Sequence, residues 1–296
     1  MFELNNINPN SVIIIAGPTA SGKSALALDI AKRYGGEIVN ADSMQVYAGT
    51  PIISAAPTEE EKQIVPHHLY EIYSPEKNGT VVEWLKLADK AIREIWKRGK
   101  LPIVAGGTGM YIDNLINGTT PIPEPTAEIR QKVAQIPDVW KWLQQNDPAA
   151  VSMLAPADST RTKRAAEIFL QTGKSIAEWY KLPMVKHMPE ADFKVIKLIP
   201  PTAELDERCY LRFDKMMKAG ALDEVKKLAE LNLPENLPAM KMLGVPELLA
   251  YLRGDDTLES AVALAKLHTR QYAKRQKTWF KNKLSAEIEL SECFGG

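Results

Sequence analysis

Residues 17–24 have the types and spacing of a phosphate-binding loop. They match the pattern G-x-x-x-x-G-K-[ST] in full. The two glycines let backbone N–H groups point at phosphate oxygens, and a following helix adds the positive end of its dipole. Lys23 would supply a full positive charge, and the Ser24 hydroxyl would bind Mg²⁺. We therefore expect phosphate binding by Gly17, Pro18, Thr19, Ala20, Ser21, Gly22, Lys23 and Ser24.

The segments on either side of this loop predict the strand and helix that such a site needs. Val12–Ala16 is a short apolar run typical of a buried parallel strand, and residues 25–31 have the composition of a helix. Further strands are predicted at Glu37–Ala41 and Leu101–Ala105, with an amphipathic helix over Val81–Arg98 between them. Alternating strands and helices predict an α/β fold, with a parallel sheet flanked by helices as in P-loop NTPases.

The pattern changes after about residue 118. Prolines punctuate short helical pieces up to residue 156, and no clear strand is predicted there. Lys194–Ile199 then has the composition of a strand that returns to the sheet. We infer a core domain of residues 1–118 and 191–296, with an all-helical insertion domain over residues 119–190. Helices are expected after the returning strand at Glu204–Lys218, Leu222–Leu231, Val245–Tyr251 and Leu258–Lys283.

Composition indicates a globular protein without a membrane partner. No apolar run approaches the roughly 20 residues of a membrane helix, and the first eleven residues carry no Lys or Arg that would mark a signal peptide. Cys209 and Cys293 lie far apart without the C-x-x-C spacing of a metal or redox site. We therefore expect free thiols in the cytoplasm, and a monomer.

Polar residues follow two of the predicted strands. Asp42 comes directly after the second strand, and Gly106-Gly107-Thr108-Gly109 follows the strand at Leu101–Ala105. Ligands bind at the carboxyl ends of strands in such sheets, so Asp42 and Thr108 should share an edge with the phosphate loop. A carboxylate there can bind Mg²⁺ or accept a proton, although a helix cap or turn is the simpler alternative. Gln45 carries an amide that can pair with adenine.

The strand at Leu101–Ala105 ends in glycine rather than in the Mg²⁺-binding aspartate of most phosphoryl-transfer sites. This feature argues against a motor-type ATPase. A small-molecule kinase built on the same loop stays open as an alternative.

The predicted C-terminal helix is strongly basic. From Lys266 to Lys283 there are seven Lys or Arg residues and no Asp or Glu, with Arg270 and Lys274 on one helical face. Such a stripe suits a phosphate backbone, although a merely solvated face explains it equally well. A second basic cluster, Arg161, Lys163 and Arg164, lies in the insertion. Two basic surfaces indicate a large polyanion even though the formal net charge is zero.

Several stretches together resemble one family, the tRNA dimethylallyltransferases, also called tRNA isopentenyltransferases. The similarity spans about residues 12 to 283 and is closest to compact members of the bacterial type. It rests on GPTASGKS at 17–24, EIVNADSMQVY at 37–47, VPHHL at 65–69, GGTGMY at 106–111, TGKS at 172–175 and TRQYAKRQKTWF at 269–280.

The resemblance implies transfer of a dimethylallyl group from dimethylallyl diphosphate to N6 of adenosine 37 of tRNA, beside the anticodon. The loop would then hold diphosphate rather than ATP, with Mg²⁺ as cofactor, and the insertion would contact the anticodon stem-loop. Asp42, Thr108 and Lys23 would be catalytic, with Asp42 accepting the N6 proton, and Arg208 and Arg212 would bind diphosphate. The implied tRNA contacts are Asp42, Ser43, Met44, Gln45, Thr108, Arg130, Thr160, Arg161, Thr162, Lys163, Arg164, Arg270 and Lys274.

The chain departs from the family pattern at Ile52–Pro57. The family usually has IGTAKP there, and both its glycine and its lysine are missing. Thr202 also stands where an arginine is often found. A sister enzyme that prenylates free AMP, ADP or ATP is one alternative function, and a non-catalytic, nucleotide-dependent RNA-binding protein is another. The long insertion and the two basic surfaces favour tRNA over a mononucleotide.

Overall fold

The computed structural model describes residues 3–295, which divide into two compact units. The core unit comprises the residues through Ile116 and those from Met188 onward, and the insertion unit is Asn117–His187. The bounds expected for the insertion, 119 and 190, fall close to these. Within the described residues, no helix combines the length and the apolar content needed to cross a membrane.

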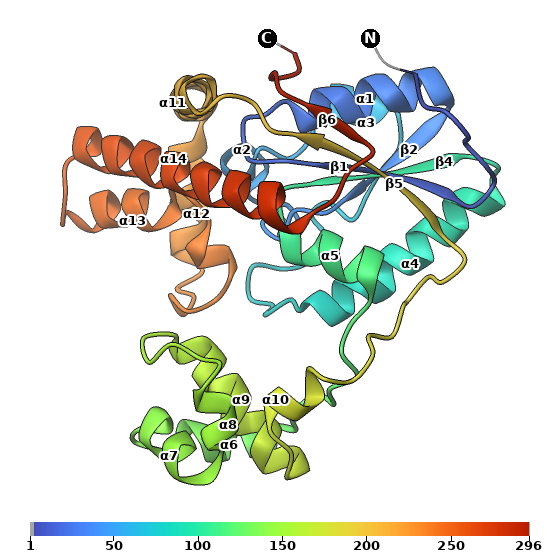
Figure 1. Cartoon of the computed structure of the whole chain (residues 1–296). Coiled ribbons are helices and arrows are strands. Elements are labelled where there is room, and N and C mark those ends of the chain that lie inside the picture. Colours follow the sequence, from blue (N-terminus) through green and yellow to red (C-terminus); the bar gives the residue numbers. More distant parts are fainter. Residues whose placement is uncertain (1–2, 296) are drawn as a thin grey trace. The chain divides into compact units, whose positions relative to one another are not determined.

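The core unit is built on one parallel sheet (Figure 1). Within residues 3–295 its strand order is β3-β2-β4-β1-β5-β6. The strands are β1 (Ser11–Ala16), β2 (Gly36–Asn40), β3 (His67–His68), β4 (Leu101–Gly106), β5 (Asp192–Leu198) and β6 (Ile288–Leu290). Strand β1 pairs with β4 on one side and with β5 on the other, so the loop that follows β1 lies in the middle of the sheet edge. The predicted α/β fold with a parallel sheet is thereby confirmed.

Helices cover both faces of the sheet because its buried strands are apolar on both sides (Figure 1). Ile13 and Ile15 of β1 pack with helix α1 (Lys23–Tyr34), whereas Ile14 lies in the core formed with α4 (Val81–Lys97) and α5 (Gly109–Asn117). The indole of Trp84 in α4 is fully buried and donates a hydrogen bond to the Asn40 carbonyl at 2.9 Å, which fixes the end of β2.

The remaining helices of the core unit lie mainly in its C-terminal part. Helices α11, α13 and α14 pack together beside the sheet, and α12 packs against α13 (Figure 1). The bounds are α2 (Pro51–Ser54), α3 (Glu59–Ile64), α11 (Thr202–Ala219), α12 (Ala221–Glu230), α13 (Val245–Arg253) and α14 (Leu258–Lys283), with a 3₁₀ turn at Ala239–Lys241. The predicted C-terminal helix is confirmed at both ends, and the other predicted helices of this part agree to within a few residues.

Two strands escaped prediction. Strand β3 has two residues and β6 has three, and among residues 3–295 each pairs with one neighbour, β2 and β5 respectively. Segments of two or three residues are too short to show the alternation of apolar and polar residues that predicts a strand. Their pairing depends on the neighbouring strand.

The insertion unit is helical and has a core of its own. Its helices are α6 (Ala127–Ala134), α7 (Val139–Asn146), α8 (Pro148–Val151), α9 (Ser159–Thr172) and α10 (Ile176–Trp179). Leu143, Ala165 and Ile168 are among its buried residues. The entering and leaving chain segments are tied by two backbone hydrogen bonds between Thr119 and Val185, of 3.1 and 2.9 Å.

Candidate active site

The phosphate loop joins the end of β1 to the start of α1, as its sequence predicts. Gly22 has a φ of +89°, and a Cβ there would lie 1.9 Å from the Phe294 carbonyl oxygen, so only glycine fits. The Ser21 hydroxyl is buried without a hydrogen-bond partner in the described part of the chain. A buried donor of this kind inside the loop suits an anionic ligand.

Lys23 is the charged group of the loop. Its Nζ donates to the Pro18 carbonyl at 2.6 Å. The pKa of Lys23 is lowered to about 8, mainly by burial; the Asp42 carboxylate raises it and the nearby positive charge of Arg212 lowers it, and about 8 is the net result. The ammonium form is therefore destabilised at its site, and a bound diphosphate would stabilise it.

This pKa predicts that the affinity of the loop for a diphosphate ligand depends on pH. Below pH 8 Lys23 is protonated and ready to bind the anion, whereas above pH 8 each binding event must also take up a proton. The dissociation constant should therefore rise by up to about tenfold per pH unit above 8. Calorimetry between pH 7 and 9.5 would measure it. Lys23→Arg is the control, since its guanidinium stays protonated, and an equally steep rise in that variant would contradict the assignment.

The ends of β2 and β4 bring Asp42 and Thr108 together. A Cβ on Gly106 would lie 2.1 Å from the Ala41 carbonyl, so glycine is required where the two strand ends meet. The Thr108 hydroxyl accepts a hydrogen bond from the Ser43 backbone N–H at 2.9 Å and donates to the Ser43 hydroxyl at 3.1 Å. The Asp42 carboxylate accepts from the Met44 N–H at 3.0 Å, which orients it. Thr108 thus fixes the turn that carries Asp42.

Gln276 of α14 links these two loops and was not predicted as a site residue. Its Oε1 accepts from the Thr19 backbone N–H at 2.8 Å, and its Nε2 donates to the Gly107 carbonyl at 2.7 Å. A Cβ on Gly107 would approach that nitrogen to 2.6 Å. The sequence signal that could have identified Gln276 is its place in the TRQYAKRQ stretch. From the sequence alone, that stretch indicates a basic helix face and not a contact with the phosphate loop.

The two arginines of α11 have different surroundings. Arg212 donates from Nη1 to the Thr19 hydroxyl at 3.1 Å, and burial lowers its pKa from the ordinary value. Arg208 donates to the Ala20 carbonyl at 3.0 Å and to the Gly295 carbonyl at 2.6 Å. Arg212 is therefore placed to bind a phosphate on the loop, whereas Arg208 holds the loop backbone and the C-terminal segment.

A cavity of about 290 Å³ in the core unit joins these groups. Its lining combines Thr19, Asp42 and Arg212 with several apolar side chains. Burial raises the pKa of the Tyr272 hydroxyl in its wall to about 12, so this phenol stays neutral. The apolar part, which sequence reasoning missed, is formed by Met44, Ile53, Phe213, Met216, Met242 and Leu243.

Gln45 does not adopt the arrangement expected of an adenine-reading residue. Its Nε2 donates to the carbonyls of Ser54, at 3.0 Å, and Ala55, at 2.7 Å. Both amide hydrogens are thereby used, so a bidentate pair with adenine would require breaking these bonds. The structure assigns Gln45 a local task instead, closing the C-terminal end of α2.

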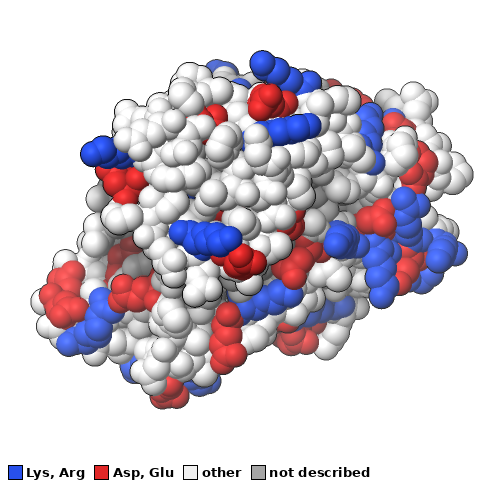
Figure 2. Space-filling view, turned by 90° about the horizontal axis from the view of Figure 1, so that it is seen from below, with Lys and Arg blue, Asp and Glu red and all other residues white. Residues whose placement is uncertain are grey.

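The basic stripe of α14 is partly neutralised. Lys266 pairs with Asp214 of α11 at 2.6 Å, which corrects the expectation of a stripe without acidic partners. Arg270 is half-buried and Lys274 is exposed. Figure 2 shows one face of the molecule, on which basic and acidic side chains are interspersed.

The basic cluster of the insertion unit is also only partly available. Arg130 and Arg164 share Glu124, at 3.2 and 3.8 Å. Thr162 is 3% exposed and its hydroxyl donates to the Asp158 carbonyl, so its side chain faces the core rather than a ligand, contrary to expectation. Thr160, Arg161 and Lys163, all on α9, are exposed.

The donor groups at the loop suit Mg²⁺. The Ser24 hydroxyl is exposed at the first turn of α1, and Asp42 offers a carboxylate. Within residues 3–295 no group of three or more His, Cys, Asp or Glu side chains forms a metal cage. Mg²⁺ is usually bound by one or two protein oxygens together with substrate phosphates, and this donor set allows that arrangement.

Comparison with known proteins identifies the family. Residues 45–283 match the family model described as IPP transferase. The chain belongs to the IPP transferase family. This membership confirms the resemblance seen in the sequence motifs.

Members of this family with similar sequences are named tRNA dimethylallyltransferase. The protein of Rickettsia massiliae (strain Mtu5) is 43% identical over 292 residues, which cover 97% of this chain and 80% of that protein. The protein of Rhodospirillum centenum (strain ATCC 51521 / SW) is 43% identical over 281 residues, covering 93% and 90%.

Solved structures of the same family share the fold. The tRNA isopentenylpyrophosphate transferase of Bacillus halodurans has a TM-score of 0.70 and 32% identity, covering 95% of this chain and 90% of that one. A eukaryotic dimethylallyltransferase acting on tRNA has a TM-score of 0.82 and 31% identity, covering 93% and 71%.

Proposed function

We propose that this chain transfers the dimethylallyl group of dimethylallyl diphosphate to N6 of adenosine 37 in tRNA and releases diphosphate. One observation carries the proposal: a single cavity joins Thr19 of the phosphate loop, the Asp42 carboxylate and an apolar wall. An apolar wall beside a phosphate loop suits a prenyl group, and phosphoryl transfer itself does not require one. The names of the relatives favour tRNA over free AMP, ADP or ATP as acceptor.

The first half of the chemistry is departure of diphosphate. When the allylic C–O bond breaks, its electron pair goes to the diphosphate, and negative charge builds on the oxygens held by the loop. Backbone N–H groups, Lys23 and Arg212 stabilise that charge. When bound through Ser24, Mg²⁺ would neutralise part of the charge on the same leaving group.

The second half is attack by adenine. The N6 lone pair is delocalised into the ring, so the amine is a weak nucleophile. It gains strength if its proton moves to the Asp42 carboxylate while the new C–N bond forms. The Met44 N–H holds this carboxylate, and Thr108 holds the turn that carries it. The adenine must leave the base stack to reach the cavity.

We further propose that tRNA contacts the exposed face of α14 and the basic cluster of the insertion unit. An open groove along α14 is lined by Lys274, Arg275 and Trp279, among others, which suits a phosphate backbone with stacked bases. The monomeric state and the cytoplasmic location expected from the sequence belong to this proposal.

This interface predicts a change in the salt dependence of tRNA binding. Removing a side chain that neutralises one phosphate should reduce the slope of log affinity against log salt by about 0.7 to 0.9. Arg270→Ala and Lys274→Ala should flatten the slope when binding is titrated from low to high salt. Lys266→Ala is the matched control, since this lysine pairs with Asp214, and it should leave the slope close to that of the wild type. Unchanged slopes in all three variants would remove α14 from the interface.

The proposed reaction is tested by measuring diphosphate release from dimethylallyl diphosphate without ATP. Release should require unmodified tRNA, and free AMP, ADP or ATP should not replace it. Release that proceeds with a free nucleotide instead of tRNA would reject the proposal in favour of the sister activity.

A further inference from the structure

The cavity extends along α11 away from the phosphate loop. Arg212 stands at the loop end, where it bonds Thr19, and Phe213 and Met216 line the cavity further along the helix. A helix rises about 1.5 Å per residue, so Met216 lies roughly 6 Å beyond Arg212 along the helix axis. A prenyl chain whose diphosphate is held by the loop would therefore extend toward these apolar side chains.

Ile53 closes this part of the cavity. It lines the cavity together with Phe213 and is only 5% exposed. A Cβ on Gly244 would lie 2.8 Å from the Phe213 ring and 3.0 Å from Ile53 Cδ1. Gly244 also has a φ of +92°, and it packs closely against Phe213 and Ile53 at this wall.

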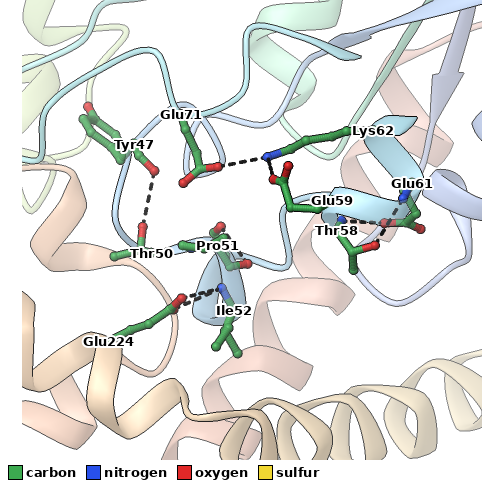
Figure 3. Close-up of polar contacts among 11 residues, drawn as sticks. Tyr47, Thr50, Pro51, Ile52, Thr58, Glu59, Glu61, Lys62, Glu71 and Glu224 are labelled. Atoms are coloured by element: carbon green, nitrogen blue, oxygen red, sulfur yellow. Dashed lines mark hydrogen bonds and ion pairs between the residues drawn. The ribbon is translucent and has the colours of Figure 1, made fainter. Parts of the chain in front are cut away.

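The helix that carries Ile53 is held at both ends. The Glu224 carboxylate of α12 accepts the N–H of Ile52 at 2.9 Å (Figure 3). It also accepts the N–H of Ile53 at 2.9 Å. At the other end, Gln45 donates to the carbonyls of Ser54 and Ala55. Glu224 is 9% exposed, so its bonds are shielded from water. The backbone that carries Ile53 is therefore held by hydrogen bonds at both ends of the short helix.

We propose that Ile53 limits the length of the prenyl group that this enzyme transfers. The inference rests on the proposed function. A five-carbon dimethylallyl group ends before the Ile53 wall, whereas the second isoprene unit of a geranyl group would collide with it. The reaction itself is unchanged for the longer donor: the C1–O bond breaks, diphosphate leaves with the electron pair, the N6–C1 bond forms, and the N6 proton goes to Asp42.

Shortening Ile53 should therefore admit the longer donor. Unmodified tRNA is incubated with dimethylallyl diphosphate or geranyl diphosphate, and the modified nucleosides are quantified by mass spectrometry. In Ile53→Ala the ratio of kcat/KM for geranyl over dimethylallyl diphosphate should rise about tenfold or more, because pocket discrimination by single methylene groups has that size. Ile53→Val removes one carbon and should give a smaller rise in a variant that keeps most of the packing.

Ile52→Ala is the matched control. It lies on the same short helix, but its side chain points toward Gly220, with its Cδ1 3.8 Å from where a Cβ of Gly220 would lie, and it does not line the cavity. The donor ratio should stay at the wild-type value.

Two outcomes overturn the proposal while the wild type still transfers dimethylallyl groups. In the first, the Ile53 variants lose both donors equally. In the second, the Ile53 variants raise KM for tRNA while the ratio of kcat/KM for the two donors stays constant. That result would mean that the Ile53 wall faces the adenine base rather than the prenyl group. A wild type that fails to transfer dimethylallyl groups at all would instead refute the proposed function.

Discussion

Asp42→Asn is expected to lower kcat for dimethylallyl transfer by a factor of about 10² to 10⁴, the usual contribution of a positioned general base. The amide keeps the shape of the carboxylate and can still accept the Met44 N–H with its oxygen, so the turn should not move. It cannot take up the N6 proton. Single-turnover transfer, measured at saturating tRNA and donor, isolates this step.

The same variant should bind tRNA with nearly unchanged affinity. Asp89→Asn is the control, since Asp89 pairs with Arg93 within α4 and does not line the cavity, and this variant should retain full activity. A parallel loss of tRNA affinity and of transfer in Asp42→Asn would assign Asp42 to binding rather than to proton transfer.

Lys23→Met should lower transfer by about 10² to 10³, because one charged stabiliser of the leaving diphosphate is removed. Methionine has a similar length, so the loop can keep its backbone path around the side chain. KM for dimethylallyl diphosphate should rise while the affinity for tRNA stays close to that of the wild type. Steady-state kinetics at several donor concentrations would separate the two effects.

Thermal unfolding provides a second test of Lys23. Burial lowers the folded-state pKa of this lysine to about 8, below its unfolded value near 10.5, so the charged form weakens the fold at pH 7, and this cost declines as pH rises through that window. Lys23→Met removes the buried charge and should therefore unfold at the same or a higher temperature. An inactive variant with clearly lower stability would indicate a structural defect instead of the absence of a diphosphate-binding group.

The fold was predictable where the sequence carries a long or specific pattern. The strand before Gly17, the amphipathic helix α4 and the helix Leu258–Lys283 all have clear apolar spacing, and the structure confirms them. Asp42 and Thr108 could be located because parallel strands end at a common edge. These inferences need only local residues and the topology of the sheet.

The rest depends on partners distant in the sequence. Gln276 reaches Thr19 across 257 residues, and no local pattern reports that bond. The amide hydrogens of Gln45 and the ammonium of Lys266 are used by groups from other elements, and Thr162 faces inward on its helix. In each case a side chain that the sequence suggests is free for a ligand is used by the fold.

The proposed reaction places the dimethylallyl group on one base of tRNA. The most direct measurement incubates the protein with isotope-labelled dimethylallyl diphosphate and unmodified tRNA, digests the product with nucleases, and identifies the labelled nucleoside by mass spectrometry. We expect a single labelled adenosine, carrying the group on N6, in the fragment that contains position 37. Label at other bases, on free nucleotides only, or nowhere in the tRNA would contradict it.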